Sequence, residues 1–148
     1  MQAQKVVVLG SINIDIFLKI DRQPQVGETM ACNNMTVGYG GKVSQQHRRL
    51  TLSVQGANQA IACAKLGAQC TMLGQVGKDD LTADKYLTWM REQGVNTELI
   101  IKTDVPTGQA YIYHYPNGDN SIILVGGANK AYKQIPNSWI QAVSEADV

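Results

Sequence analysis

The chain has 148 residues, enough for one domain with a buried core, and its 44% hydrophobic and 17% charged residues are ordinary for a globular protein. The net charge is +1 and the basic residues are scattered, which argues against a nucleic-acid or membrane partner, because both need a concentrated basic surface. We expect a cytoplasmic protein, since no apolar run could span a bilayer, no signal peptide is evident, and the three cysteines have neither an even count nor metal-ligand spacing.

The first third of the chain predicts strands and turns. Residues 5–10 form a β-branched run that is typical of a buried parallel strand. Residues 14–20 alternate in polarity, as a strand with one solvent face does. After a turn marked by Pro24 and Gly27, residues 29–38 predict a second extended stretch that runs into a glycine-rich corner at 38–42.

The middle of the chain predicts alternating helices and strands. Residues 57–66 are small and apolar and precede Gly67, which indicates a helix packed against a flat surface. A buried strand is expected at 69–76, an amphipathic helix at 81–92 and a further strand at 95–101.

The last third predicts a hairpin and a final helix. Residues 107–115 alternate, with Gln109 and three tyrosines on one face and the smaller Ala110 and Ile112 on the other. The Asn117-Gly118 pair favours a tight turn with positive φ at both positions, followed by a return strand at 121–125. A helix is expected after Pro136, with a new strand starting at 147–148. The predicted fold class is therefore α/β: helices on a mostly parallel sheet, with a small antiparallel sheet that projects from it.

Two polar residues at the end of the first strand are candidates for ligand binding. Ligands of open α/β sheets bind at the carboxyl ends of the strands, and Asn13 and Asp15 follow the first strand two positions apart, so their side chains face the same way. A carboxylate beside an amide suits vicinal hydroxyl groups, because the carboxylate accepts and the amide both donates and accepts. The alternative is an ordinary polar turn.

Two glycine-rich segments are further candidates. Gly41 and Lys42 lie where backbone N–H groups could approach a ligand, but Thr36 and Val43 rule out a Walker loop. Asn58 opens the predicted helix at 57–66 and is either a cap or a ligand contact. The tyrosine stripe covers one face of the small sheet, contacts a second subunit or stacks on a ligand, and neither His47 nor His114 has a partner pattern typical of catalysis.

Several short motifs, in order and with matching spacing, resemble the ribokinase/PfkB-type family of sugar kinases. They lie at residues 8–15, 24–29, 40–42, 56–60, 64–68, 76–80, 107–108 and 126–129. The resemblance implies that residues 1–148 are the N-terminal part of a ribokinase-like domain with a Rossmann-type core. It also implies a β-sheet lid built from about 14–20, 29–38, 107–115 and 121–126, which often pairs with the lid of a second copy.

The same resemblance implies a chemistry. Family members transfer the γ-phosphoryl group of ATP to a sugar hydroxyl, with magnesium and a monovalent cation. The sugar would be held by Asn13, Asp15, Gly41, Lys42 and Asn58, and ribose is the favoured sugar because Gly-Gly-Lys and Gly-Ala-Asn-Gln resemble the ribose-specific branch.

The family's catalytic Asp, in a Gly-Ala-Gly-Asp stretch, has no counterpart in this sequence, and the nucleotide and cation sites would lie beyond Val148. We therefore expect no catalytic residue and no kinase activity in the chain as given. The alternatives are a non-catalytic sugar-binding or lid-pairing module and a mis-spliced fragment without function. A dinucleotide-dependent oxidoreductase is disfavoured because no G-x-G-x-x-G follows the first strand.

Residues 43–55 depart from the family pattern. They form a polar, basic insertion of thirteen residues between Lys42 and the helix that carries Asn58. Because Val codons begin with GT and one Gln codon ends in AG, a segment from Val43 to Gln55 could be a retained in-frame intron; the alternative is a surface loop. A smaller departure is Thr82, where the family has Gly.

Overall fold

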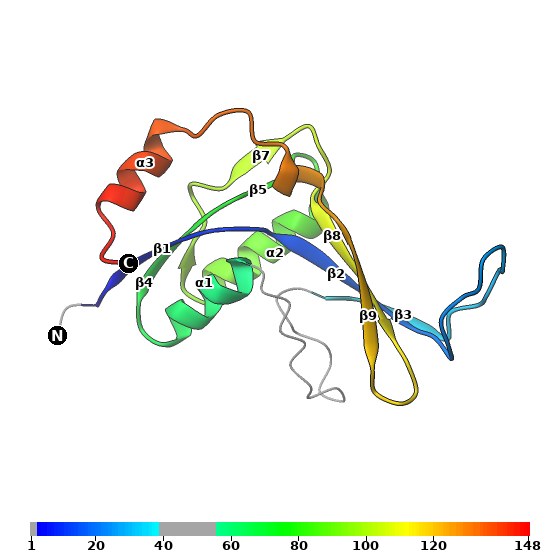
Figure 1. The fold of residues 1–148 in the computed structure, drawn as a ribbon. Coiled ribbons are helices and arrows are strands. Elements are labelled where there is room, and N and C mark those ends of the chain that lie inside the picture. Colours follow the sequence, from blue (N-terminus) through cyan, green and yellow to red (C-terminus); the bar gives the residue numbers. More distant parts are fainter. Residues whose placement is uncertain (1–2, 39–55) are drawn as a thin grey trace.

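The computed structural model describes residues 3–38 and 56–148, which form an α/β core and a sheet that projects from it (Figure 1). The core sheet contains the parallel strands β1 (Lys5–Leu9), β4 (Gln69–Leu73) and β6 (Val95–Asn96), in the order β1-β4-β6. Helices α1 (Gly56–Lys65) and α2 (Leu81–Glu92) lie on one side of this sheet, and α3 (Asn137–Ser144) lies on the other. The predicted fold class is confirmed.

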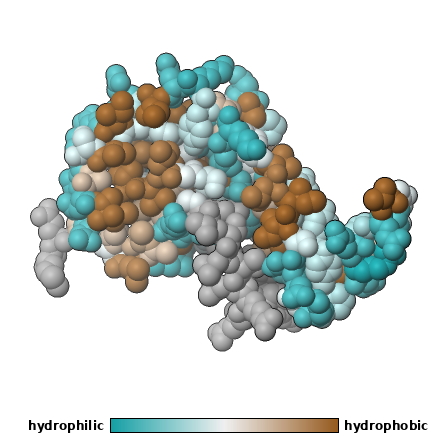
Figure 2. All heavy atoms as spheres, in the orientation of Figure 1, coloured by the Kyte–Doolittle hydropathy of each residue, from teal (hydrophilic) through white to brown (hydrophobic). Residues whose placement is uncertain are grey.

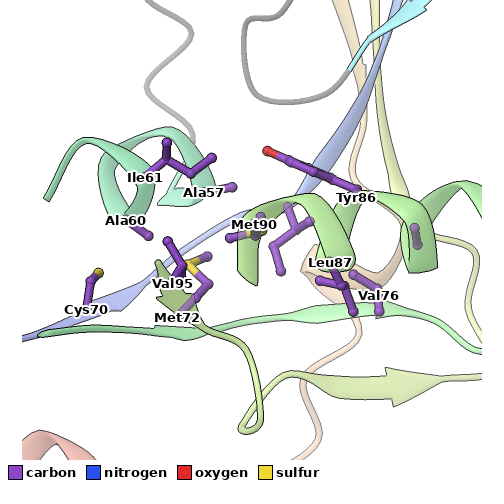
Figure 3. Close-up of a cluster of buried hydrophobic side chains, with 12 residues drawn as sticks. Ala57, Ala60, Ile61, Cys70, Met72, Val76, Tyr86, Leu87, Met90 and Val95 are labelled. Carbon is purple, nitrogen blue, oxygen red and sulfur yellow. The ribbon is translucent and has the colours of Figure 1, made fainter. Parts of the chain in front are cut away.

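The hydrophobic core lies between the sheet and the first two helices. Figure 3 shows side chains of α1 and α2, among them Ala60 and Met90, gathered with those of β4 and β6. The inward residues of α1 are small, which lets the helix approach the strands closely, and α2 contributes the larger buried side chains. The buried members are Ile12, Ala57, Ala60, Ile61, Cys70, Met72, Val76, Ala83, Tyr86, Leu87, Met90 and Val95.

The projecting sheet has four strands: β2 (Asn13–Lys19), β3 (Asn34–Gly38), β8 (Gly108–His114) and β9 (Asn120–Val125), in the order β3-β2-β8-β9. Its two central strands run parallel, and each outer strand is antiparallel to its neighbour. This mixed sheet corresponds to the antiparallel sheet predicted from the sequence, with the parallel β2–β8 pair as a difference. The pair joins distant parts of the chain that the sequence pattern could not show to be neighbours.

The predicted strands at 69–76 and 95–101 are each divided in two. Gly74 separates β4 from β5 (Gln75–Gly77), which leaves the core sheet to pair with β7 (Ile101–Thr103). A Cβ at Gly74 would lie 2.9 Å from Ile12 Cδ1 and 3.0 Å from Gly10 O, so a larger residue would force these neighbours to shift. After β6, the Asn96 side chain accepts a hydrogen bond from Glu98 N at 2.9 Å and turns the chain before β7 begins.

The turn between β8 and β9 differs from the predicted one. Gly118 alone has positive φ, at 86°, and Asn117 does not. Tyr115 N donates to Asp119 O and Gly118 N donates to Tyr115 O, which makes the loop longer than a two-residue turn. The predicted turn with positive φ at both positions is therefore wrong, although the hairpin itself is confirmed.

The C-terminal segment returns to the core. A short 3₁₀ helix, η1 (Gly127–Lys130), follows β9, and α3 is anchored by Trp139, whose Nε1 donates to Leu99 O at 2.8 Å. Val7 N donates to Val148 O at 3.0 Å, so the last residues lie along the free edge of β1, where a new strand was predicted to start. In the described part of the chain, no helix has the length and hydropathy that crossing a membrane would require.

Candidate functional site

The side chains of Asn13 and Asp15 lie on one face of the projecting sheet, directly after the chain leaves the core sheet. They occupy alternate positions of β2, and both are buried, with exposed fractions of 6% and 4%. The neighbours on either side are small: Gly108 pairs with Asn13, while Ala110 and Gly38 pair with Asp15. The neighbours of the two polar side chains on the adjacent strands therefore have no side chain or only a methyl group.

The same face becomes apolar further along the sheet. Phe17, Ala110 and Ile112 form a buried cluster there, and the ring of His114 stacks on that of Phe17 with 5.6 Å between centroids. Figure 2 shows hydrophobic side chains gathered over β8 and β9. Of the residues of β9, Ile122 and Leu124 pair with Ile112 and Ala110 and so belong to this face, which combines a polar end at Asn13 and Asp15 with an apolar part.

The tyrosine stripe lies on the opposite face. Tyr111 alternates with Ala110 and Ile112 along β8, and its hydroxyl donates to Gln109 Oε1 at 2.6 Å. The Tyr115 hydroxyl bonds to Ser121 Oγ across the hairpin at 3.1 Å. These contacts give two of the tyrosines structural hydrogen bonds on the face away from Asn13 and Asp15.

The start of α1 is held against the segment that precedes Asn13. Ala57 N donates to Ser11 O at 3.2 Å. A Cβ on Gly10 would lie 2.7 Å from Gly56 Cα, so the two backbones touch at these glycines. This contact brings the first turn of α1, which carries the half-buried Asn58, next to the chain that leads into β2.

Gly41, Lys42 and the insertion at 43–55 lie outside the described residues. The described residues on either side of this gap, Gly38 and Gly56, both lie at the end of the molecule that carries the candidate site. Gly38 pairs with Asp15, and Gly56 contacts Gly10. The structure thus places Asn13 and Asp15 on one face of β2, and the first turn of α1 beside the Gly10–Ser11 segment that leads into this strand.

The side chain of Asn129 contributes to the site in a way that sequence reasoning missed. Its Nδ2 donates to Asn13 Oδ1 at 2.7 Å and to Ile12 O at 3.1 Å, and its Oδ1 accepts from Ile12 N at 2.9 Å. The sequence placed Asn129 in a family motif but assigned it no role. Its position after two glycines, at the end of a predicted strand, was the available signal.

A groove of about 520 Å³ lies elsewhere, and none of Asn13, Asp15 and Asn58 lines it. It lies between the core sheet and the end of α3, and its lining includes Lys5, Thr71 and Ala142. We place the candidate site on the projecting sheet, because the buried polar side chains of Asn13 and Asp15 lie there.

Comparison with known proteins assigns almost the whole chain to one protein family. The sequence pattern described as "pfkB family carbohydrate kinase" matches residues 3–148. A protein named ribokinase from Dictyostelium discoideum is 35% identical over 125 residues, and one from Staphylococcus aureus is 39% identical over 126. Each alignment covers 84% of this chain but only 35% and 37% of the relative, so the chain spans about a third of the length of these proteins.

Solved structures give the same result. Arabidopsis thaliana ribokinase complexed with ribose and ATP superposes with a TM-score of 0.70 at 31% identity, over 98% of this chain and 44% of that one. Cryptococcus neoformans ribokinase in complex with ADP gives a TM-score of 0.69 at 31% identity, over 90% of this chain and 38% of that one.

Proposed function

Because this chain belongs to the pfkB family of carbohydrate kinases, we propose that it is the sugar-binding part of an ATP-dependent ribose kinase. Relatives named ribokinase and a relative solved with ribose and ATP support the choice of sugar. The observation that carries the proposal for this chain is the pair of buried polar side chains, Asn13 and Asp15, on the face of the projecting sheet that also holds an apolar cluster.

In this proposal each polar residue binds sugar hydroxyl groups. The Asp15 carboxylate accepts hydrogen bonds from two hydroxyls, and Asn13 bonds to the same or a neighbouring one. Gly41, Lys42 and Asn58 complete the site from the glycine-rich corner and the first turn of α1. The apolar cluster of the projecting sheet, which acts as a lid, covers the C–H face of the sugar and limits the access of water.

The chemistry of phosphoryl transfer would come from outside residues 1–148. Across residues 3–38 and 56–148, no three His, Cys, Asp or Glu side chains are grouped so as to hold a metal ion by themselves. We assign ATP, magnesium and the monovalent cation to the part of the domain that the longer relatives have in addition, because this sequence has no counterpart of the family's Gly-Ala-Gly-Asp stretch. The chain as given would bind ribose without turning over ATP, and it would reside in the cytoplasm with its three cysteines reduced.

Calorimetry with ribose tests the proposal. Asp15→Asn should weaken ribose binding by roughly tenfold or more, because a hydrogen bond to a charged group contributes about 1.5–3 kcal/mol. Asp119→Asn is a matched control, since Asp119 lies in the β8–β9 loop, where its carboxylate accepts from Asn117 at 2.7 Å. Equal ribose affinity in wild type and Asp15→Asn would contradict the assignment, and ribose-dependent ATP hydrolysis by the purified chain would contradict the expected inactivity.

The insertion at 43–55 has its own test. If it is a retained intron, deleting it restores the family spacing between Lys42 and Gly56 and should increase ribose affinity. If it is a surface loop of the natural protein, the deletion should leave affinity unchanged or lower it, and the genomic and transcript sequences should show no intron boundary.

A second candidate function is pairing of two copies through the lid, without catalysis. The specific observation is β9, an edge strand with exposed apolar side chains at Ile123, Leu124 and Val125. An exposed edge of this kind favours association. Sedimentation of the wild type and of Leu124→Lys tests the pairing itself, which predicts a dimer that the substitution dissociates. Calorimetry then distinguishes the cases, because a module that only pairs binds no ribose.

A further inference from the structure

The side chains of Asn129 and Asn13 form a hydrogen-bonded pair in which only one orientation of the two amides is consistent. They lie 116 positions apart in the sequence, and Asn129 Nδ2 donates to Asn13 Oδ1 at 2.7 Å. An amide presents an acceptor at one end and a donor at the other, so the way each group points decides what a neighbouring ligand meets. The inference below rests on the proposed sugar site.

The backbone of Ile12 fixes the orientation of Asn129. Ile12 N is always a donor, and it donates to Asn129 Oδ1 at 2.9 Å. Ile12 O is always an acceptor, and it receives Asn129 Nδ2 at 3.1 Å. Exchanging the oxygen and nitrogen of Asn129 would place donor against donor and acceptor against acceptor, so the end that faces Asn13 is a donor.

The orientation of Asn13 follows from that of Asn129. Since Asn129 presents N–H to it, Asn13 must present its carbonyl oxygen in return. The NH₂ group of Asn13 is then the end that remains for another acceptor. Beside it, on the same face of β2, the Asp15 carboxylate is an acceptor.

The surrounding backbone leaves room for this pair and holds it in place. A Cβ on Gly108 would collide with both Asn129 Nδ2 and Asn13 Oδ1, so the pair occupies the space that a side chain would need. The η1 turn that carries Asn129 is tied to the start of β8, because Ala128 N donates to Pro106 O at 2.8 Å. Ala128 is fully buried, which fixes the turn against the core.

We propose that Asn129 is a positioning residue that sets the hydrogen-bond polarity of the sugar site by orienting the amide of Asn13. The site then offers a donor at Asn13 next to an acceptor at Asp15. A neutral hydroxyl satisfies both, because it accepts from Asn13 and donates to Asp15. An ammonium group can donate to Asp15 but cannot accept from Asn13, so it would leave the Asn13 donor without a partner.

The substitution Asn129→Asp reverses this polarity with little change in shape. One oxygen of the new carboxylate still accepts from Ile12 N, while the other, at the former Nδ2 position, loses the bond to Ile12 O and faces Asn13, so it needs a donor. The Asn13 amide should therefore rotate, donate to that carboxylate and present its own oxygen to the ligand. Asn96→Asp is a matched control, because the acceptor role of Asn96 Oδ1 toward Glu98 N survives the substitution.

NMR spectra of the side-chain amides in the complete ¹⁵N-labelled chain detect this rotation of the Asn13 amide in the absence of sugar. The Asn13 NH₂ signals, identified by their loss in Asn13→Asp, should move downfield in Asn129→Asp, as expected for a donor to a carboxylate, and stay in place in Asn96→Asp. Unchanged Asn13 signals in a folded Asn129→Asp chain would overturn the proposal. If that variant does not fold, the wild type decides: the Asn129 NH₂ protons should exchange with water more slowly than those of Asn13, and the reverse order refutes the orientation.

Calorimetry with ribose separates this inference from the function on which it rests. Asn129→Asp should weaken ribose binding by roughly tenfold or more, while Asn96→Asp leaves it unchanged. Equal affinity in Asn129→Asp and wild type would overturn the polarity argument and leave the sugar site standing. If the wild type binds no ribose, the proposed function fails for this chain, and the amide spectra still decide whether Asn129 orients Asn13.

Discussion

Gly10 and Gly56 touch backbone to backbone: a Cβ built on Gly56 would lie 2.6 Å from Gly10 Cα. The contact joins the end of β1 to the first residue of α1, which are far apart in the sequence. It sets how closely α1 approaches the strand and therefore where the turn that carries Asn58 lies relative to β2. Neither neighbour is a flexible side chain that could move aside.

We predict that Gly56→Ala lowers the free energy of unfolding by about 1–3 kcal/mol, because the added methyl group forces two backbone segments apart. Urea unfolding followed by circular dichroism measures this. Gln59→Ala, at an exposed position of the same helix, should be neutral or slightly stabilising, since alanine is the better helix former. Equal midpoints for wild type and Gly56→Ala would show that the contact can relax without cost.

Gly108→Ala should separate Asn13 from Asn129, since the new methyl group would occupy the position of their hydrogen bond. The expected result is a loss of ribose affinity of at least roughly tenfold with a smaller loss of stability. Calorimetry and urea unfolding together measure both quantities. Gln109→Ala, on the opposite face of β8, is the control and should keep wild-type affinity; equal ribose affinity in Gly108→Ala would show that the pair does not organise the site.

The cysteines should differ in reactivity. Burial of Cys70, with a smaller effect from Cys63, raises the pKa of its thiol from 9.0 to about 11, which lowers its thiolate fraction about a hundredfold at pH 8. Cys32 is exposed. Alkylation with iodoacetamide under native conditions, followed by mass spectrometry, should label Cys32 first and Cys70 last. Labelling of Cys70 at the rate of Cys32 would mean that the core around α1 opens readily.

The loop between β2 and β3 is held by Glu28. Its carboxylate pairs with Arg22 and accepts from Gln25 N at 2.9 Å, and these bonds, that of Arg22 first, lower the pKa of Glu28 from 4.5 to about 2. Because the folded-state pKa is lowered, the stabilising contribution is present above about pH 4.5 and is lost as the pH falls toward 2. A ¹³C NMR titration of the Glu28 carboxyl should give a midpoint near 2.

Arg22→Gln provides the control for this titration. Removing the guanidinium should return the Glu28 midpoint toward its ordinary value, while the bond from Gln25 N keeps part of the shift. A midpoint near 4.5 in the wild type would show that the pair does not persist in solution, as exposed ion pairs often do not.

The fold class was predictable because each element has a strong local pattern. The β-branched run of β1 and the stop glycine after α1 gave both elements within a residue or two. The strand break at Gly74 was not predictable, since it depends on tertiary contacts: the approach of Ile12 and Gly10 to Gly74 and the departure of β5 to pair with β7. The break after Asn96 is a local turn closed by the bond from Glu98 N to Asn96 Oδ1, and the sequence prediction overlooked it. Apolar runs alone cannot show where a strand changes sheet.

The site was predictable only in part. The spacing of Asn13 and Asp15 showed that they share a face, because alternation along a strand is a local property. The role of Asn129 could not be derived from the sequence, because its hydrogen bond to Asn13 joins residues 116 positions apart. This bond also depends on Gly108, since any side chain there would occupy the same space. The assignment of Asn13, Asp15, Gly41, Lys42 and Asn58 to the sugar remains a prediction.

The parallel pairing of β2 with β8 has a consequence for the kinetics of folding. Each outer hairpin, β2–β3 and β8–β9, can form from its own neighbourhood, but joining them requires the chain to close a loop around α1, β4 and α2. Contacts between such distant segments form slowly. During synthesis on the ribosome, β2 remains unpaired with β8 until β8 has emerged. The Asn13–Asn129 hydrogen bond should therefore be among the last contacts to form, and among the first to be lost on heating.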